Sequence, residues 1–222
     1  MESFDFSDLL NMVLTLVASL ICITLHELSH GYVAWKLGDN TAKGLGRLTL
    51  NPLKHLDVAG MIMMLVFQVG WAKPVPVNMS NFKNPKRGMA LVATAGPLSN
   101  IIITVFFLAL YGLLFIPLAG TVVGGYLLHL CELTAYISLG FAVFNLLPFP
   151  PLDGAKMLFS FLKDEHYDKL MQYEFYGSII LIVLMLTGTL GYPIAVIRQL
   201  IYNDLMPIAQ WACDLVAIMF YM

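Results

Sequence analysis

Four long apolar runs constrain this chain of 222 residues to a membrane. A helix needs about 20 apolar residues to cross a bilayer, and in lipid it must satisfy its own backbone hydrogen bonds. The runs are Leu9–Leu37, Met89–Leu118, Thr121–Leu147 and the somewhat shorter Tyr176–Leu190. The predicted fold is therefore an all-α polytopic membrane protein, built as a transmembrane helix bundle.

Composition and length agree with one membrane-embedded domain over residues 1–222. The chain is 59% hydrophobic and 12% charged, whereas soluble domains are about 25% charged. We expect a core over residues 9–154 and additional apolar helices over residues 171–222. The net charge of −2 argues against a nucleic-acid partner. The acidic start of the chain predicts a retained first span rather than a cleaved signal peptide.

Two further stretches are harder to place by length alone. Pro193–Tyr221 is apolar but carries three charged residues, so it either spans or lies partly at the interface. Val58–Trp71 holds only 14 residues, which suits a re-entrant element. It lies within Thr41–Asn84, where glycine, proline and alternating apolar residues predict short strands and turns. We expect a small re-entrant β/loop element between the first two core helices; an ordinary cytoplasmic loop is the alternative.

Basic residues predict the orientation. They cluster at 36–54, 73–87 and 156–169, and all three clusters are cytosolic if Val58–Trp71 dips into the membrane and returns. The first helix then runs from outside to inside. The chain is expected in the cell membrane as a multi-pass protein.

The sequence His26-Glu27-Leu28-Ser29-His30 lies inside the first apolar run. Residues four apart share a helix face, so both imidazoles can bind one zinc ion, and Glu27 is placed to act as general base on a zinc-bound water. The alternative is a pair of hydrogen-bonded core histidines. It would leave Glu27 buried without a partner, at a cost of several kcal/mol, so we predict a zinc site.

A catalytic zinc site has three protein ligands and one open position. Asp153 follows the third apolar run, after prolines that break the helix, so its carboxylate is expected near the depth of the histidine pair. It could instead be a turn or cap residue. The other candidates for the third ligand are His129, Glu132, His55 and Asp57.

Two other polar positions stand out. Asn145 is a candidate to bind substrate or the oxyanion, with hydrogen bonding at a helix end as the alternative. In the sequence Ala95-Gly96-Pro97-Leu98-Ser99-Asn100, small residues predict close helix packing, and Asn100 can bridge helices.

Together these motifs resemble the site-2 proteases, which are intramembrane zinc metalloproteases. The resemblance rests on HELSH at 26–30, AGPLSN at 95–100 and NLLPFPPLDG at 145–154, in that order. It implies that His26, His30 and Asp153 bind zinc, that Glu27 is the catalytic base, and that a three-helix core is reached from the cytosol. The chain looks like the minimal bacterial or archaeal type, without a PDZ or CBS domain.

The expected function is hydrolysis of peptide bonds within or near transmembrane segments of membrane proteins. The expected partners are such a protein or peptide and the lipid bilayer. A prenyl-protein type of membrane metallopeptidase would need a downstream glutamate ligand on a helix. A non-proteolytic zinc-binding membrane protein or transporter would not need Glu27, because metal binding requires only the ligands.

Overall fold

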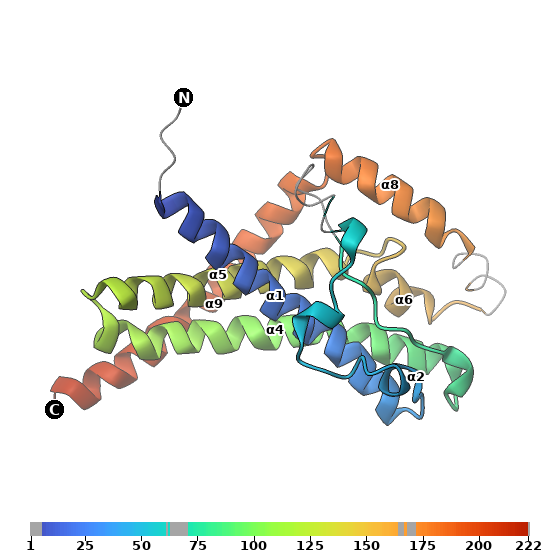
Figure 1. Ribbon diagram of the computed structural model, residues 1–222, viewed down its shortest axis with the longest axis horizontal. Helices are drawn as coiled ribbons and strands as arrows, with labels where there is room; N and C mark the ends of the chain where they lie inside the picture. Colours follow the sequence, from blue (N-terminus) through green and yellow to red (C-terminus); the bar gives the residue numbers. More distant parts are fainter. Residues whose placement is uncertain (1–5, 61, 63–70, 164–166, 168–171, 222) are drawn as a thin grey trace.

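The computed structural model describes residues 6–60, 62, 71–163, 167 and 172–221. This part of the chain is mainly helical (Figure 1), which confirms the all-α prediction. The long helices are α1 (Phe6–Lys36), α4 (Pro85–Leu118), α5 (Val122–Asn145) and α9 (Gly191–Tyr221). The shorter ones are α2 (Thr41–Gly44), η1 (Pro52–Lys54), η2 (Met79–Asn81), α6 (Asp153–Phe159) and α8 (Glu174–Leu186).

The first three predicted spans form helices that are long and apolar enough to cross a membrane. They cover Ser7–Lys36, Pro85–Leu118 and Val122–Asn145. Local sequence explains where the latter two begin. The Asn84 side chain accepts the backbone N–H of Arg87, and the Thr121 hydroxyl accepts that of Gly124, so each helix has a capped first turn. The protein is a multi-pass membrane protein.

The predicted span Tyr176–Leu190 does not form one straight helix. Helix α8 ends at Leu186, and 13 residues reach only about 20 Å at 1.5 Å per residue. Gly188 has φ +71°, a conformation that ends a helix readily. Helices α8 and α9 therefore meet at 81°, and together they pass as one broken span or a re-entrant loop.

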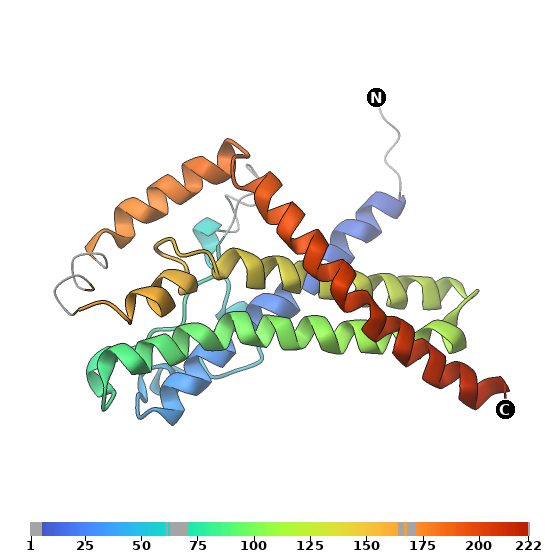
Figure 2. The ribbon, with the colours of Figure 1, turned by 180° about the vertical axis from the view of Figure 1, so that it is seen from behind.

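Helices α4 and α5 run side by side in opposite directions and form the centre of the molecule. Helix α1 crosses one face of this pair, and α9 crosses the other, as the two opposite views show (Figures 1 and 2). Helix α1 is thus held in place by its packing against α4 and α5.

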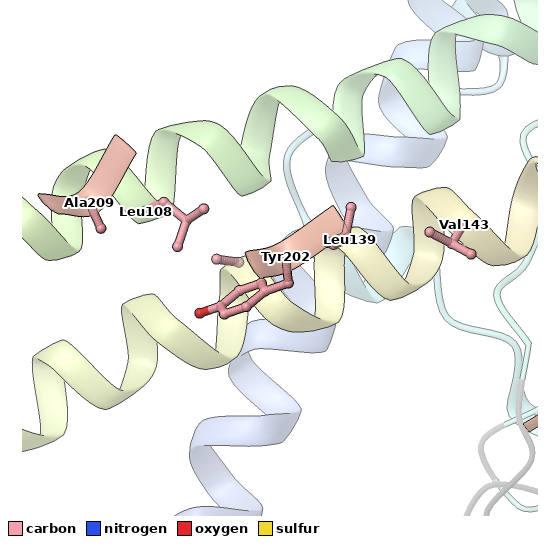
Figure 3. Packing of buried hydrophobic residues seen from close by; sticks show 6 residues of the cluster. Leu108, Leu139, Val143, Tyr202 and Ala209 are labelled. Carbon is pink, nitrogen blue, oxygen red and sulfur yellow. The ribbon is translucent and has the colours of Figure 1, made fainter. Parts of the chain in front are cut away.

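A buried apolar cluster joins α9 to the central pair (Figure 3). Its members are Leu108 of α4, Ala135, Leu139 and Val143 of α5, and Tyr202 and Ala209 of α9. The helices approach closely at Gly112, where a Cβ would lie 2.1 Å from the Ala209 carbonyl oxygen. Small residues thus allow α9 to pack tightly on α4, as expected for helices in lipid.

The segment between α1 and α4 differs from the expected β/loop element. In its described residues there is one isolated antiparallel bridge, Leu56 with Ala72, and no strand. From Lys73 to Asn78 the backbone forms neither helix nor strand, and Pro74 and Pro76 lack the N–H groups that a ladder requires. The predicted re-entrant stretch Val58–Trp71 lies largely outside the described residues, at 61 and 63–70.

Candidate metal centre

His26, Glu27 and His30 lie on one side of α1, where it packs against α4. Their exposed fractions are 8%, 9% and 8%, so all three are buried in a helix of membrane-spanning length. The two imidazoles stand edge to face, with Nε2 atoms 3.0 Å apart. The spacing of four residues therefore brings the rings together as the sequence predicted.

Asp153 joins this pair from a distant part of the chain. It is the first residue of α6, and its Oδ2 lies 3.2 Å from His26 Nε2 and 3.2 Å from His30 Nε2. The turn that leads to Asp153 is tight: a Cβ on Gly154 would lie 2.3 Å from the Leu146 carbonyl oxygen. Glycine at this position lets α6 begin directly against the end of α5.

These three atoms fit a zinc ion. In a tetrahedral site with bonds of about 2.0–2.1 Å, neighbouring ligand atoms lie about 3.3 Å apart. The observed separations are 3.0, 3.2 and 3.2 Å. Among the residues that the structure describes, His26, His30 and Asp153 form the group that could hold a metal ion.

The charge of Asp153 suits this role. Burial raises the pKa of its carboxyl, but the imidazoles of His26 and His30 lower it by more, so the net pKa lies well below its usual range. Asp153 is therefore ionised at neutral pH, and an anionic oxygen faces two imidazole nitrogens. A bound metal cation would take the place of the hydrogen bonds between these groups, because a carboxylate oxygen and neutral imidazole nitrogens are both metal ligands.

Helix α4 orients the His30 ring. His30 Nδ1 lies 2.7 Å from the Val92 carbonyl oxygen, which can only accept a hydrogen bond. Nδ1 therefore carries the hydrogen, and Nε2 keeps a lone pair for a metal. Such a partner fixes both the tautomer and the direction of a metal-binding imidazole.

Asn100 orients the other ring. Its amide lies 3.1 Å from His26 Nδ1, and the residue is fully buried. The amide oxygen would be left without a donor if the nitrogen faced the ring. With the amide turned so that Oδ1 faces His26, the oxygen accepts the Nδ1–H hydrogen bond, and His26 Nε2 is free to bind a metal. The predicted helix bridge by Asn100 is thus a direct contact with His26.

The three residues open onto a cavity of about 260 Å³. Its wall combines polar groups with small apolar side chains, a mixture suited to hold water and a peptide. The lining residues are His26, Glu27, His30, Pro74, Val75, Val77, Met89, Val92, Ala93, Asn145, Pro151, Asp153 and Lys156.

The structure places Asn145 in this cavity, at the C-terminal end of α5. Its Nδ2 donates to the Phe141 carbonyl at 3.0 Å, so the amide also serves the helix end. The structure thus shows the hydrogen bond at the helix end, and a role in binding substrate stays a prediction. An amide has two N–H groups, so one remains for a substrate.

Sequence reasoning missed two parts of the cavity. Lys156 lies three residues after Asp153, one helical turn along α6, and its Nζ lies 3.4 Å from Glu174 Oε1 of α8. The helical spacing from Asp153 was a usable signal. Val75 was also missed: its N–H donates to Glu27 Oε2 at 2.8 Å, across 48 residues.

The other candidate ligands have different surroundings. His129 and Glu132 lie on α5 with 40% and 56% exposed side chains, and His129 Nδ1 lies 3.9 Å from Glu132 Oε2. The buried His55 ring bonds the Thr49 carbonyl at 2.9 Å, and Asp57 accepts the Gly60 N–H at 2.8 Å. The structure brings none of these four to the His26–His30 pair.

Comparison with known proteins identifies a family of metalloproteases. The model of peptidase family M50 matches residues 110–187, a range that contains Asn145 and Asp153. YwhC of Bacillus subtilis, named as a candidate zinc metalloprotease, is 40% identical over 198 residues, covering 86% of this chain and 89% of its own. Rip2 of Mycolicibacterium smegmatis, named likewise, is 30% identical over 81% of this chain and 69% of its own.

A third relative, MJ0611 of Methanocaldococcus jannaschii, is also named as a candidate zinc metalloprotease. It is 32% identical over 70% of this chain and 76% of its own length. No solved structure matches the chain at a significant level.

Proposed function

The chain belongs to peptidase family M50, the site-2 protease family, and we propose that it is an intramembrane zinc endopeptidase that cleaves membrane proteins. Its metalloprotease class and its zinc follow from the family. The site residues, the place of cleavage and the orientation are our proposals.

One observation carries the proposal. The candidate ligand atoms of His26, His30 and Asp153 converge within 3.2 Å of one another, and Glu27 lines the same cavity. Three of these four residues lie on α1, which is long and apolar enough to cross a membrane. Ionisable groups at such a position are costly and are usually functional.

We assign zinc binding to His26, His30 and Asp153. When bound, zinc supplies a Lewis acid that lowers the pKa of water and polarises a peptide carbonyl. The remaining steps belong to side chains of this chain. Glu27 accepts a proton from the attacking water and then delivers it to the leaving amine. Glu27 therefore ends the reaction in the protonation state in which it began.

Asn145 is our candidate for binding the substrate carbonyl. It lines the cavity with Glu27 and Asp153, and its second N–H is available to stabilise negative charge on the carbonyl oxygen. His26, Glu27 and His30 are buried, and the low local dielectric of such a site strengthens a hydrogen bond of this kind.

The depth of the site supports cleavage within or near the bilayer. His26 lies ten residues before Lys36, the end of α1, which is about 15 Å along the helix axis. The basic clusters predict that this end of α1 is cytosolic. We therefore propose that water and the substrate reach the cavity from the cytosolic side.

The substrate class follows from the same geometry. A helix engages its own carbonyls in hydrogen bonds, so a peptide must be locally extended before its carbonyl can enter the cavity. We propose a transmembrane protein or peptide whose helix unwinds readily near the cytosolic interface. The lipid bilayer is the second partner.

The alternatives fare less well. A prenyl-protein type of site predicts a helical glutamate as third ligand, whereas Asp153 follows a proline-rich break and lies against both imidazoles. A non-proteolytic zinc carrier does not need Glu27 in its cavity, and the family is one of peptidases.

The test is metal content and peptide hydrolysis of the purified protein in detergent. Glu27→Gln should keep one zinc per chain and lose activity by several orders of magnitude. His26→Ala and Asp153→Ala should lose both zinc and activity, because each removes a ligand. His129→Ala and Glu132→Gln are matched controls, since they remove the same chemical groups from α5.

Two results would overturn these assignments. Near-normal hydrolysis by Glu27→Gln would remove Glu27 as the base. Full zinc occupancy in Asp153→Ala, with loss in His129→Ala or Glu132→Gln, would move the third ligand to α5.

A further inference from the structure

The segment Lys73–Asn78, here called the strap, lines the active-site cavity and touches Glu27. We propose that the strap is a positioning device: through the backbone N–H of Val75 it fixes the Glu27 carboxylate in its working orientation, and Asp39 and Arg47 hold the strap in place. This inference rests on the proposed function, because it assigns a task to the residues around the proposed base.

The contact at the centre of the strap is buried and short. The Val75 N–H donates to Glu27 Oε2 at 2.8 Å, and the exposed fractions of the two residues are 8% and 9%. A hydrogen bond to a carboxylate is stronger than one between neutral groups. It holds one carboxylate oxygen, so Oε1 is left to receive a proton.

The sequence of the strap makes this donor unique. Pro74 and Pro76 flank Val75, and neither has a backbone N–H. Both prolines also restrict the backbone to extended conformations, so the strap resists collapse into a turn or helix. The one N–H between them is the one that meets Glu27.

Arg47 holds the first end of the strap. Its Nη2 donates to the Lys73 carbonyl at 2.8 Å, although Arg47 itself is only 8% exposed. The Lys73 N–H donates to the His55 carbonyl at 2.9 Å. Arg47 thus uses a buried guanidinium to fix the position of a single backbone carbonyl, that of Lys73.

Asp39 holds the second end. Its Oδ2 accepts the Asn78 N–H at 2.7 Å, and its Oδ1 accepts the Asn81 side chain at 2.7 Å. Asp39 is fully buried and lies three residues after the end of α1 at Lys36. The strap is thus tied to the chain directly after the helix that carries Glu27. This link keeps the Val75 N–H at a fixed position relative to the Glu27 carboxylate.

The first experiment removes the Val75 donor. Val75→Pro deletes the N–H, whereas Val75→Ala deletes most of the side chain and keeps the N–H. With zinc content measured in each, kcat and KM are determined on the same peptide. We expect Val75→Pro to have a kcat at least ten-fold below that of Val75→Ala, with similar KM and zinc content. A structural defect would instead lower zinc content.

The second experiment loosens an anchor. Asp39→Ala should lower kcat at constant zinc content, and Asp39→Asn, which keeps one acceptor oxygen, should restore part of it. Asn84→Ala is the control, because it removes a helix cap of α4 and leaves the strap contacts intact. Its kcat should match that of the parent protein.

Several outcomes would overturn the proposal. Equal kcat for Val75→Pro and Val75→Ala would show that the N–H does not matter, and a higher kcat would mean that the strap obstructs the site. If Val75→Pro lost zinc, replacement of Val75 by its α-hydroxy acid, which swaps only the N–H for oxygen, gives the same comparison. Normal activity of Glu27→Gln would remove Glu27 as the base, whereas a zinc-loaded parent protein that hydrolyses no peptide would refute the proposed function itself.

Discussion

Gly96 of α4 faces His30 of α1 so closely that a Cβ at residue 96 would lie 2.5 Å from His30 Nε2. The same Cβ would lie 2.5 Å from Cε1 of His26. The hydrogen atom of glycine therefore leaves the space that the two rings need. Helix packing, which the sequence suggested for Gly96, and the proposed metal binding thus depend on the same atom.

Gly96→Ala should therefore weaken zinc binding. The methyl group must push one or both imidazoles away from Asp153, and we expect zinc affinity to fall by about ten-fold or more, as when other neighbours of metal ligands are changed. Gly125→Ala is the control, because nothing lies within 4 Å of a Cβ at that position of α5. Competition with a chromophoric chelator measures both; equal affinities would contradict the packing argument.

Asn100→Ala should also weaken zinc binding, by about 10–100-fold, because the His26 Nδ1–H loses its partner and the ring is free to turn. Asn203→Ala is a suitable control: Asn203 pairs with Gln199 on the exposed side of α9. Zinc affinity is measured by the same competition. An unchanged value for Asn100→Ala would mean that helix packing alone orients His26.

The sequence could predict the parts of the site that local spacing determines. The four-residue interval of His26 and His30 sets a shared helix face, and the long apolar runs set three spans. Asp153 was recognisable because its motif resembles that of a known family, whereas spacing alone left four other candidates.

The features that the sequence did not predict depend on contacts between segments that are distant in the chain. The Val75 N–H meets Glu27 across 48 residues, and no periodicity encodes a backbone donor. The same region was expected to form strands because its residues alternate. Its described residues form one isolated bridge, and Pro74 and Pro76 lack the N–H groups that a ladder requires. The separation of α8 from α9 was predicted, since Tyr176–Leu190 and Pro193–Tyr221 were read as two runs, but the 81° angle between the helices was not, because hydropathy carries no information on helix direction.

The protein should lose part of its stability in acid through Asp39. Burial raises the pKa of this carboxyl, but hydrogen bonds from Thr41, Asn78 and Asn81 lower it by more, so the net pKa is below the usual value. The carboxylate then contributes stability above the unfolded-chain pKa of about 3.9, and this contribution is lost as pH falls toward the folded-state pKa.

Asp39→Asn removes this titration. The Tm of the variant in detergent should be lower than that of the parent protein at pH 6, and the difference should shrink as pH falls below about 4. Thermal unfolding at a series of pH values measures both. A Tm difference that stays constant across this range would show that Asp39 does not stabilise the fold through its charge.

The final prediction concerns which side of the membrane the site faces. Lys54 and Lys83 are exposed and lie before and after the stretch predicted to be re-entrant. Cysteines introduced by Lys54→Cys and Lys83→Cys should therefore react only with a reagent that reaches the cytosol. Val122→Cys, at the exposed turn between α4 and α5, should react from the opposite side.

This labelling is interpretable in a Cys213→Ser background, because Cys22 and Cys131 are buried and Cys213 is partly exposed. Helix α4 is long enough to cross the bilayer, so its two ends should differ in labelling whichever way the protein is inserted. Labelling of residues 54 and 83 from opposite faces would mean that the intervening stretch crosses fully. Labelling of both from outside would place the cavity entrance on the outer side of the membrane.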